Sequence, residues 1–408
     1  MMAELARSSW ELPPLDPGEL QPFAGFPRLT DGEKEGLWCD YRAGKAERVP
    51  VMLAMNDRVF LLDPRFNEER LGYARVFEAA EAMLLVQLRA QYLVRSRYNL
   101  FCDLPAGLPE RWQVAPFFQN VYEAAALGVP IEFKENDVPA VVSSVADADK
   151  RSLLDLPIDE PLERGVYRIG IEMTHRMREL VQGKTFFGRP IEVVPYAELG
   201  SDGPLTVAMN VRGSGILVDL IEDPDYAREL FDHLVAAALV RRRAFVHYWG
   251  LPDPEEVWLA DDSIATISVS QYAQRVLPHH RKWYDTLDPE HTKRRGMHLC
   301  GDATRHFPVI RERLGVQTFD TGFPVDFAAL RRTLGPEVEI LGGVEVPRLL
   351  AGPPQAIYRR ARAILASGVL EGRRFVLREA NNLPPGVPWS HLAAMYQAAF
   401  DGGVFGPA

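Results

Sequence analysis

The segment Met297-His298-Leu299-Cys300-Gly301-Asp302 brings a histidine, a thiol and a carboxylate together at the end of a short apolar run. Side chains alternate between the two faces of a β-strand, so His298 and Cys300 point the same way. An imidazole beside a thiol is a ligand pair that suits zinc. Gly301 then lets the backbone turn sharply. The segment therefore predicts a strand whose carboxyl end carries a candidate metal-binding pair.

Seven other short apolar runs along the chain are also typical of strands. The eight predicted strands are residues 50–55, 98–102, 205–210, 257–260, 296–300, 316–319, 338–341 and 375–378. Most lack sustained polar alternation, which is typical of strands that are buried on both faces. Helical patterns, such as those over 74–95, 224–249 and 270–287, separate the strands. This alternation predicts an α/β fold of the closed (β/α)8 TIM-barrel class.

An open, doubly wound sheet is the alternative fold. Such a sheet usually has a glycine-rich loop after its first strand, and Asn56-Asp57-Arg58 does not resemble one. The prediction is therefore a single barrel over residues 46–408, with an N-terminal extension, 1–45, packed on its surface. The extension is rich in proline and glycine and has scattered aromatics such as Trp10, Phe23 and Phe26. Residues 104–203 are interpreted as a large insertion between strands two and three, since a structureless loop of that length is improbable.

Composition excludes several classes of function. The 408 residues include 46 basic and 56 acidic ones, a net charge of −10, which argues against nucleic-acid binding. The basic run Arg241-Arg242-Arg243 lies in a predicted helix and is interpreted as a solvated face. Three widely spaced cysteines favour the reducing cytoplasm. We expect neither a signal peptide nor a membrane span, because no suitable apolar run is present.

The carboxyl ends of the predicted strands are unusually polar, and barrel enzymes place their chemistry at these ends. The candidate site residues are Asn56, Arg58, Asp103, Asn210, Asp262, His298, Cys300, Asp320, Glu379 and Asn381. Neighbouring Asp261 and Asp262 face opposite sides, so we expect Asp262 at the site and Asp261 to cap the following segment. His279 and His280 diverge by about 100° on a predicted helix, which favours surface positions over a metal pair.

Several segments carry a resemblance to a known superfamily. They are 258–263, 297–301, 315–320 and 341–344, with weaker likenesses at 101–104, 203–206 and 349–354. With these segments in order over about residues 46–408, the chain resembles the uroporphyrinogen decarboxylases and zinc-dependent corrinoid methyltransferases. The resemblance implies the same barrel fold.

The two chemistries of this superfamily use different residues. In its decarboxylases, arginines after strand one bind the carboxylates of a porphyrinogen. Here only Arg58 and Arg65 lie nearby, although the family's aspartate after strand two corresponds to Asp103. In its methyltransferases, a His-x-Cys pair and a late cysteine bind zinc. The pair corresponds to His298 and Cys300, but Asn381 takes the place of the late cysteine, so Glu379 is the candidate third ligand.

These observations predict metal-assisted methyl (alkyl) transfer, or demethylation, of a small molecule in the barrel mouth. The expected metal ligands are His298, Cys300 and Glu379, with zinc as the metal and iron or no metal left open. Asp103, Asp262 and Glu379 are the expected catalytic groups. Asn56, Arg58, Asn210, Asp320 and Asn381 are expected to bind the substrate. A corrinoid or folate is the expected methyl carrier, a corrinoid protein a possible partner, and a homodimer a possible assembly.

Two alternatives remain open at the level of the sequence. One is a decarboxylase or other lyase that uses Asp103 without a metal. The other is a non-catalytic subunit that binds a substrate or a corrinoid protein within a methyltransferase system.

Overall fold

A five-stranded parallel sheet forms one side of the molecule. The computed structural model describes residues 10–12, 14–15, 28–143 and 145–406, so the aromatics Phe23 and Phe26 lie outside the described residues. The sheet order is β10-β9-β8-β7-β6. These strands are β6 (Glu256–Ala260), β7 (Arg294–Leu299), β8 (Thr318–Thr321), β9 (Glu339–Glu345) and β10 (Phe375–Ala380). The last five predicted strands are thus confirmed in position and order.

The first predicted strand lies beside β10. Val51 forms a parallel bridge with Leu377. The backbone amide of Met52 donates to the Leu377 carbonyl at 3.0 Å, and the Leu377 amide donates to the Pro50 carbonyl at the same distance. Residues 50–54 therefore form an extended segment that runs parallel to β10, at the edge of the five-stranded sheet.

The second and third predicted strands are wrong. Residues Tyr98–Phe101 form a 3-10 helix, η2, and the run around Leu205 lies in helix α8 (Pro204–Arg212). Pro204 at the start of α8 is preorganised for a helix, and the Asp261 carboxylate accepts from the backbone amides of Leu205 and Thr206. A short apolar run fits a helix as well as a strand, so its periodicity alone could not separate the two.

The segment 104–203 contains strands of its own. Here β1 (Trp112–Val114) pairs in parallel with β5 (Arg189–Val193), which also pairs with β4 (Thr185–Phe186) in an antiparallel hairpin. A second hairpin joins β2 (Ile131–Glu132) to β3 (Ala140–Val141). The segment interpreted as an insertion therefore adds a parallel strand pair to the fold, as well as a hairpin that reaches the cavity described below.

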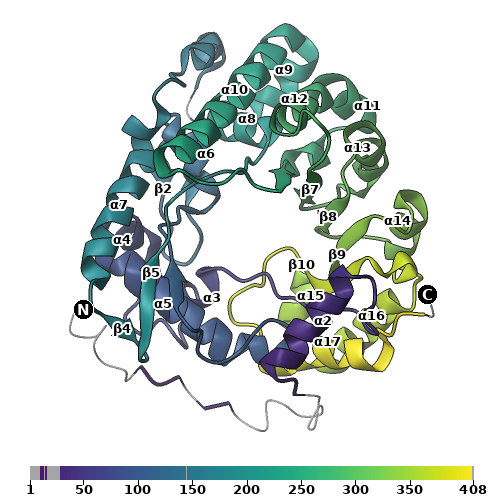
Figure 1. Cartoon of the computed structure of the whole chain (residues 1–408). Coiled ribbons are helices and arrows are strands. Elements are labelled where there is room, and N and C mark those ends of the chain that lie inside the picture. Colours follow the sequence, from purple (N-terminus) through teal and green to yellow (C-terminus); the bar gives the residue numbers. More distant parts are fainter. Residues whose placement is uncertain (1–9, 13, 16–27, 144, 407–408) are drawn as a thin grey trace.

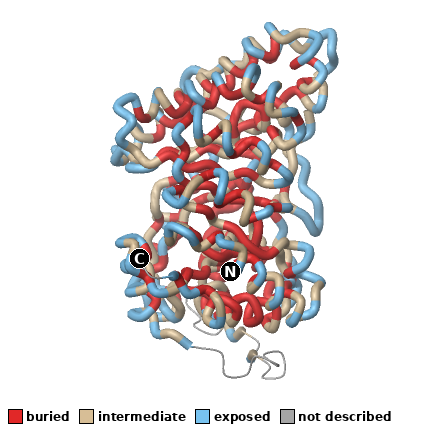
Figure 2. Tube along the Cα trace, turned by 90° about the vertical axis from the view of Figure 1, so that its right-hand side faces the viewer, coloured by how far each residue is buried: buried red, intermediate tan, exposed pale blue. Residues whose placement is uncertain are grey.

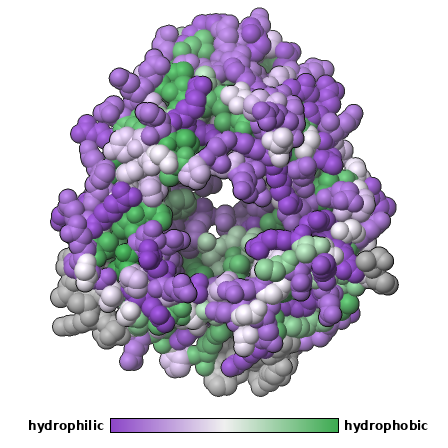
Figure 3. All heavy atoms as spheres, viewed as in Figure 1, coloured by the Kyte–Doolittle hydropathy of each residue, from purple (hydrophilic) through white to green (hydrophobic). Residues whose placement is uncertain are grey.

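Helices surround the strands in a ring (Figure 1). The α-helices are α2 (Asp31–Arg42), α3 (Arg58–Leu61), α4 (Tyr73–Glu78), α5 (Ala80–Ser96), α6 (Tyr122–Ala126), α7 (Gly165–Val181), α8, α9 (Gly215–Glu222), α10 (Pro224–Trp249), α11 (Val269–Gln271), α12 (Leu277–Leu287), α13 (Phe307–Leu314), α14 (Phe327–Leu334), α15 (Val346–Ala351), α16 (Pro354–Leu365) and α17 (Trp389–Gly402). The predicted helix over 74–95 is broken at Ala79, which has an extended backbone. Seen from the side, buried segments lie in the middle of the molecule and exposed ones along its outline (Figure 2), and the space-filling view has an opening at its centre (Figure 3).

The prediction of solvated surface positions is confirmed for Arg243, which is exposed, and is wrong for Arg241, Arg242, His279 and His280. Arg241 and Arg242 are only 2% and 5% exposed, and His279 and His280 are 5% and 0% exposed. The arginines donate to carbonyls of the chain at 198–200, and His280 lies between Asp261 and the Tyr272 hydroxyl. A run of charged residues on a helix has the same sequence pattern whether the helix face contacts water or another part of the chain. The sequence therefore could not indicate the buried partners of these arginines and histidines.

Within the described part of the chain, no helix combines the length and apolar character needed to cross a bilayer.

A matched pair of glycine substitutions tests the packing of the strands. A Cβ at Gly342 of β9 would lie 2.2 Å from the Thr321 hydroxyl and 3.0 Å from the Phe327 ring, whereas a Cβ at exposed Gly36 of α2 meets no atom within 4 Å. We expect Gly342→Ala to lower the free energy of unfolding by about 1–3 kcal/mol through overpacking. Gly36→Ala should raise it by about 0.5–1 kcal/mol, since alanine favours a helix interior. Urea unfolding measures both, and an unchanged Gly342→Ala protein would contradict the packing described here.

Candidate metal centre and cavity

The register of three parallel strands brings the candidate metal ligands together. Ala260 of β6 lies opposite His298 of β7, which in turn lies opposite Asp320 of β8. Asp262 follows β6 by two residues, and Cys300 directly follows β7. Leu299, between His298 and Cys300, is fully buried, whereas its two neighbours are partly exposed. The predicted alternation, with His298 and Cys300 on one face, is therefore present.

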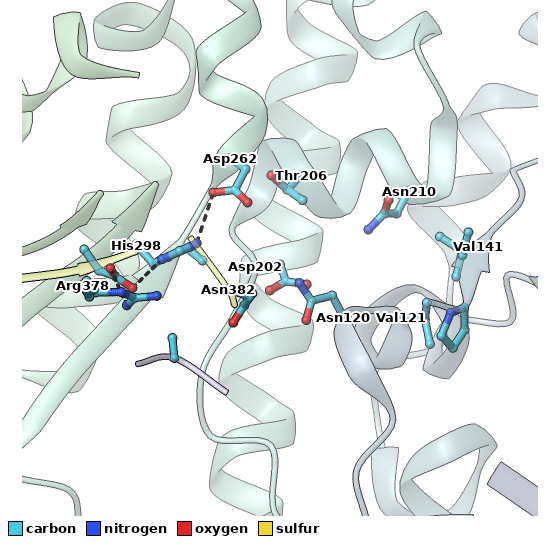
Figure 4. Close-up of a pocket in the computed structure, with 15 residues that line it drawn as sticks. Asn120, Val121, Val141, Asp202, Thr206, Asn210, Asp262, His298, Arg378 and Asn382 are labelled. Atoms are coloured by element: carbon cyan, nitrogen blue, oxygen red, sulfur yellow. Dashed lines mark hydrogen bonds and ion pairs between the residues drawn. The ribbon is translucent and has the colours of Figure 1, made fainter. Parts of the chain in front are cut away.

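Three potential ligand atoms converge at this point. The His298 Nε2 lies 2.9 Å from the Cys300 Sγ and 4.0 Å from the Asp262 Oδ1. All three ligand atoms, from Asp262, His298 and Cys300, lie within 4.8 Å of one another. The same Asp262 oxygen accepts a 2.6 Å hydrogen bond from the Cys300 amide, which fixes one acid relative to the thiol. Figure 4 shows Asp262 and His298 facing each other at the cavity.

Asp320 and Arg378 hold the opposite edge of the imidazole. The His298 Nδ1 lies 2.7 Å from one Asp320 oxygen, and the Arg378 guanidinium donates to the other at 2.7 Å. A carboxylate behind a histidine is the usual way in which a metal-binding imidazole is oriented. Asp320, which the sequence predicted to bind substrate, lines the cavity but is engaged by these two residues.

Hydrogen bonding also sets the charges of this group. Burial lowers the pKa of His298, but its hydrogen bonds with Asp320 and Cys300 outweigh burial and raise the pKa well above its usual value. Burial raises the pKa of Asp320, yet the His298 hydrogen bond and the Arg378 charge bring it below its usual value. The His298–Asp320 contact is therefore a charge-assisted pair in the ligand-free protein.

A cavity of about 540 Å³ opens next to this group. Four predicted site residues line it, namely Asn210, Asp262, His298 and Asp320. The remaining lining comes from Ala54, Asn120, Val121, Pro139, Ala140, Val141, Asp202, Thr206, Ala260, Arg378 and Asn382. The β2–β3 hairpin and α8 thus form much of the cavity wall that the predicted strands do not.

Five of the polar lining residues were not among the candidates from the sequence, namely Asn120, Asp202, Thr206, Arg378 and Asn382. Asn120 lies shortly after β1, in the segment that was interpreted as an insertion. Asp202 directly precedes the Gly203–Thr206 stretch that carries the family resemblance, yet it was not among the candidate site residues. The resemblance at residues 203–206 was the sequence feature that could have indicated Asp202 as a site residue.

Glu379 is buried behind the cavity rather than grouped with the three ligand atoms. Its Oε1 accepts from the Ala54 amide at 2.8 Å and from Arg378 at 3.4 Å, while its Oε2 has no partner among the described residues. Burial raises the pKa of Glu379 to about 7. The carboxylate that lies within 4.8 Å of the His298 and Cys300 ligand atoms is that of Asp262, and Glu379, the expected third ligand, is not part of this group.

Asp103 lies away from the cavity. It is fully buried, and its carboxylate accepts from Arg48 at 2.7 and 2.8 Å, from the Val51 amide at 2.7 Å and from the Tyr396 hydroxyl at 2.9 Å. Val51 lies early in the first extended segment, whereas Ala54, further along, reaches the cavity. The expectation of a catalytic Asp103 depended on a strand at 98–102, and that strand is absent.

Three of the expected substrate-binding residues also lie outside this cavity. Arg58 donates to the Gln119 side chain at 3.2 and 3.3 Å, and Asn56 lines a neighbouring cavity. The Asn381 side-chain oxygen accepts from the Asn382 amide, and it is Asn382 that lines the cavity beside His298. Asn381 has a positive φ of 90°, which turns the chain directly after β10.

Comparisons with known proteins bear on the fold and the family. The family model described as uroporphyrinogen decarboxylase (URO-D) matches residues 113–401. This range begins after Asp103 and is shorter than the likeness seen over 46–408. A solved structure of a methyltransferase from Methanosarcina mazei is similar with a TM-score of 0.62 and 18% sequence identity, covering 90% of this chain and 98% of that one. The comparison with curated proteins found no match.

Replacing Asp103 should affect stability and not the metal centre. Asp103→Asn removes the counter-charge of Arg48 and should lower the free energy of unfolding by on the order of 3 kcal/mol. Asp225→Asn is the matched control, since Asp225 has a side chain that is 84% exposed, and we expect a change of less than about 0.5 kcal/mol. Denaturant titration gives both values. Loss of metal binding by a folded Asp103→Asn protein would contradict this assignment.

The raised pKa of Glu379 predicts a specific dependence of stability on pH. The folded protein holds this proton up to about pH 7, whereas the unfolded chain releases it near pH 4.5, so the free energy of unfolding falls as pH rises between these values. Glu379→Gln cannot ionise, so its stability relative to wild type should rise across this range by on the order of 3 kcal/mol.

Urea titrations at several pH values measure this difference. Glu172→Gln, at a side chain that is 61% exposed, is the control and should leave the pH dependence unchanged. A constant difference in stability between Glu379→Gln and wild type from pH 4.5 to 8 would contradict the prediction.

Proposed function

The chain belongs to the uroporphyrinogen decarboxylase family, and on that premise we propose that it catalyses metal-assisted methyl or other alkyl transfer to a small thiol in the 540 Å³ cavity. The observation that carries this proposal is the convergence of Asp262, His298 and Cys300 within 4.8 Å at the cavity. The fold likeness to a structure named as a methyltransferase is consistent with it. The lyase alternative lacks the support it needed, because Asp103 is buried away from this cavity.

The donor set fits a divalent metal. A carboxylate, an imidazole and a thiolate are ligands of zinc, and catalytic zinc sites use three protein ligands and leave one position open for substrate. The carboxylate makes the set harder than one with two thiolates, so iron remains a second candidate. Asp320 provides the hydrogen bond behind His298 that metal-binding histidines commonly have.

A metal held there would lower the pKa of a substrate thiol and favour its thiolate, the nucleophile of the transfer. The thiolate sulfur would bond to the methyl carbon, the bond between that carbon and the carrier would break with its electron pair left on the carrier, and the thiol proton would be released to solvent. The side chains have separate tasks around that thiol. Asp320 and Arg378 fix the His298 ring, while Asp262 fixes the Cys300 backbone through its 2.6 Å hydrogen bond. Asn210, Thr206 and Asn382 line the cavity and supply hydrogen-bonding groups for the remainder of the substrate.

The methyl carrier in this proposal is a corrinoid or a folate. A corrinoid protein would then dock at the opening of the cavity, and a homodimer is compatible with the proposal. Incubation of the metal-loaded protein with methylcobalamin and a thiol, followed by detection of the methyl thioether, tests the transfer itself.

Metal analysis tests the centre. After loading with zinc and removal of free metal, wild type should retain about one equivalent, and His298→Ala, Cys300→Ser and Asp262→Ala should retain far less. Asp320→Asn should weaken the zinc affinity by about 10–100-fold, because it removes the group behind His298. Asp302→Asn is the control, since Asp302 is exposed and close in sequence but outside the converging group. A wild-type protein that holds no metal would overturn the proposed function.

A further inference from the structure

Asp202 presents a free carboxylate to the cavity. It lines the cavity together with Asn120 and Asn382, and Figure 4 draws these residues between the His298 side and Asn210. The Asp202 side chain makes no hydrogen bond or ion pair with any described residue, although its backbone amide is bonded. The three other acids of this region, Asp262, Asp320 and Glu379, all have such partners.

A buried ion pair fixes the backbone that carries Asp202. The Asp202 amide donates to Glu123 at 2.6 Å, and the Ser201 hydroxyl donates to the same carboxylate at 3.1 Å. Glu123 is in turn paired with Arg241 at 2.6 Å, and both side chains are at most 6% exposed. Arg241 also donates to the carbonyls of Glu198 and Gly200. The carboxylate of Asp202 is therefore held at the cavity by a rigid support that leaves it unpaired.

No lysine or arginine among the described lining residues is free to bind an anionic substrate group, and the cations of the ligand group, His298 and a bound metal, lie at the sulfur end of the cavity. Among its described lining residues, Arg378 is the sole lysine or arginine. The Arg378 guanidinium already binds Asp320 at 2.7 Å, Glu379 at 3.4 Å and the Asn381 carbonyl. An anionic group beside Asp202 would therefore have no lysine or arginine as its counter-charge, and the ionised form of this carboxylate would repel it.

Resting on the proposed function, we propose that the thiol substrate carries a protonated amine, and that Asp202 binds this ammonium group as its counter-ion. Asn120 and Asn382 offer amide oxygens to the remaining N–H groups. The acceptor is on this view an aminothiol, and thiols that carry a carboxylate or sulfonate are disfavoured. Asp202 thus determines specificity, while Asp262, His298 and Cys300 hold the sulfur end.

The neighbours of Asp202 agree with a cation at this position. Burial and the charges of Glu123 and Asp262 raise the pKa of Asp202 well above its usual value, Arg241 lowers it, and Glu198 raises it slightly. The surrounding acids thus outweigh the one arginine. A substrate ammonium would favour the ionised carboxylate and relieve this crowding of acids.

Calorimetric titration of the full-length, zinc-loaded protein with three small thiols tests the proposal. The thiols are cysteamine, which is cationic, 2-mercaptoethanol, which is neutral, and 3-mercaptopropionate, which is anionic. We expect cysteamine to bind at least about tenfold more tightly than 3-mercaptopropionate, because hydrogen bonds between charged groups are worth more than neutral ones. Asp202→Asn should weaken cysteamine by about tenfold and leave 2-mercaptoethanol unchanged.

The outcomes separate this inference from the proposed function. Asp225→Asn, at an exposed side chain outside the cavity, should leave all three affinities unchanged. If 2-mercaptoethanol binds but 3-mercaptopropionate equals cysteamine, or Asp202→Asn keeps the wild-type order, this inference is wrong and the proposed function stands. If none of the three thiols binds, the proposed function fails and this inference fails with it. If Asp202→Asn does not fold, Asp202→Ser is titrated in its place, because the ammonium of cysteamine also acidifies its thiol and the role of Asp202 has to be isolated by substitution.

Discussion

The parallel register of β6, β7 and β8 is the constraint on which the site depends. It aligns Ala260 with His298 and His298 with Asp320, so three strand ends deliver their polar residues to one place. A shift of one residue in β7 would turn His298 and Cys300 to the other face of the sheet. Buried neighbours such as Met297 and Leu299, both fully inaccessible, make that shift costly because they would then face the cavity.

A second constraint comes from the helical side of the ring. Arg241 of α10 and Glu123 of α6 form a buried ion pair, which is expensive to desolvate unless its remaining donors are satisfied. The carbonyls of Glu198 and Gly200 satisfy them, so the pair fixes the chain that leads to Asp202 and α8. The same Arg241 that was predicted to face solvent thus shapes a wall of the cavity.

The sequence predicted the strand half of the molecule better than the helical half. Strands β6 to β10 have strong apolar runs bounded by turns, and alternation alone placed His298 and Cys300 on one face. The run after Gly203 is equally apolar, but Pro204 and the Asp261 cap decide in favour of a helix. The assignment of Asp103 to the site failed in the same way. A polar residue that follows an apolar run lies at a strand end only if the run forms a strand, and residues Tyr98–Phe101 form a 3-10 helix. Glu379 was near the site in sequence, but side chains alternate along β10, and it is the neighbouring Arg378 that lines the cavity while Glu379 accepts from the Ala54 amide.

The cavity has two sides that are held in place by different interactions. One side carries the ligand group of Asp262, His298 and Cys300, and the other carries Asp202. The ligand group depends on the strand register and on the Asp320–Arg378 ion pair. Arg378 is the sole lysine or arginine among the described residues that line the cavity. The bond that orients His298 therefore engages the arginine that an anionic substrate would otherwise use as its counter-charge. The wall that carries Asp202 is held by the Arg241–Glu123 ion pair. Neither of these two side chains forms a hydrogen bond with Asp262, His298 or Cys300. Under the proposed function, a change in the charge of the substrate would require substitutions in the wall that carries Asp202, whereas a change of metal would require substitutions at the strand ends.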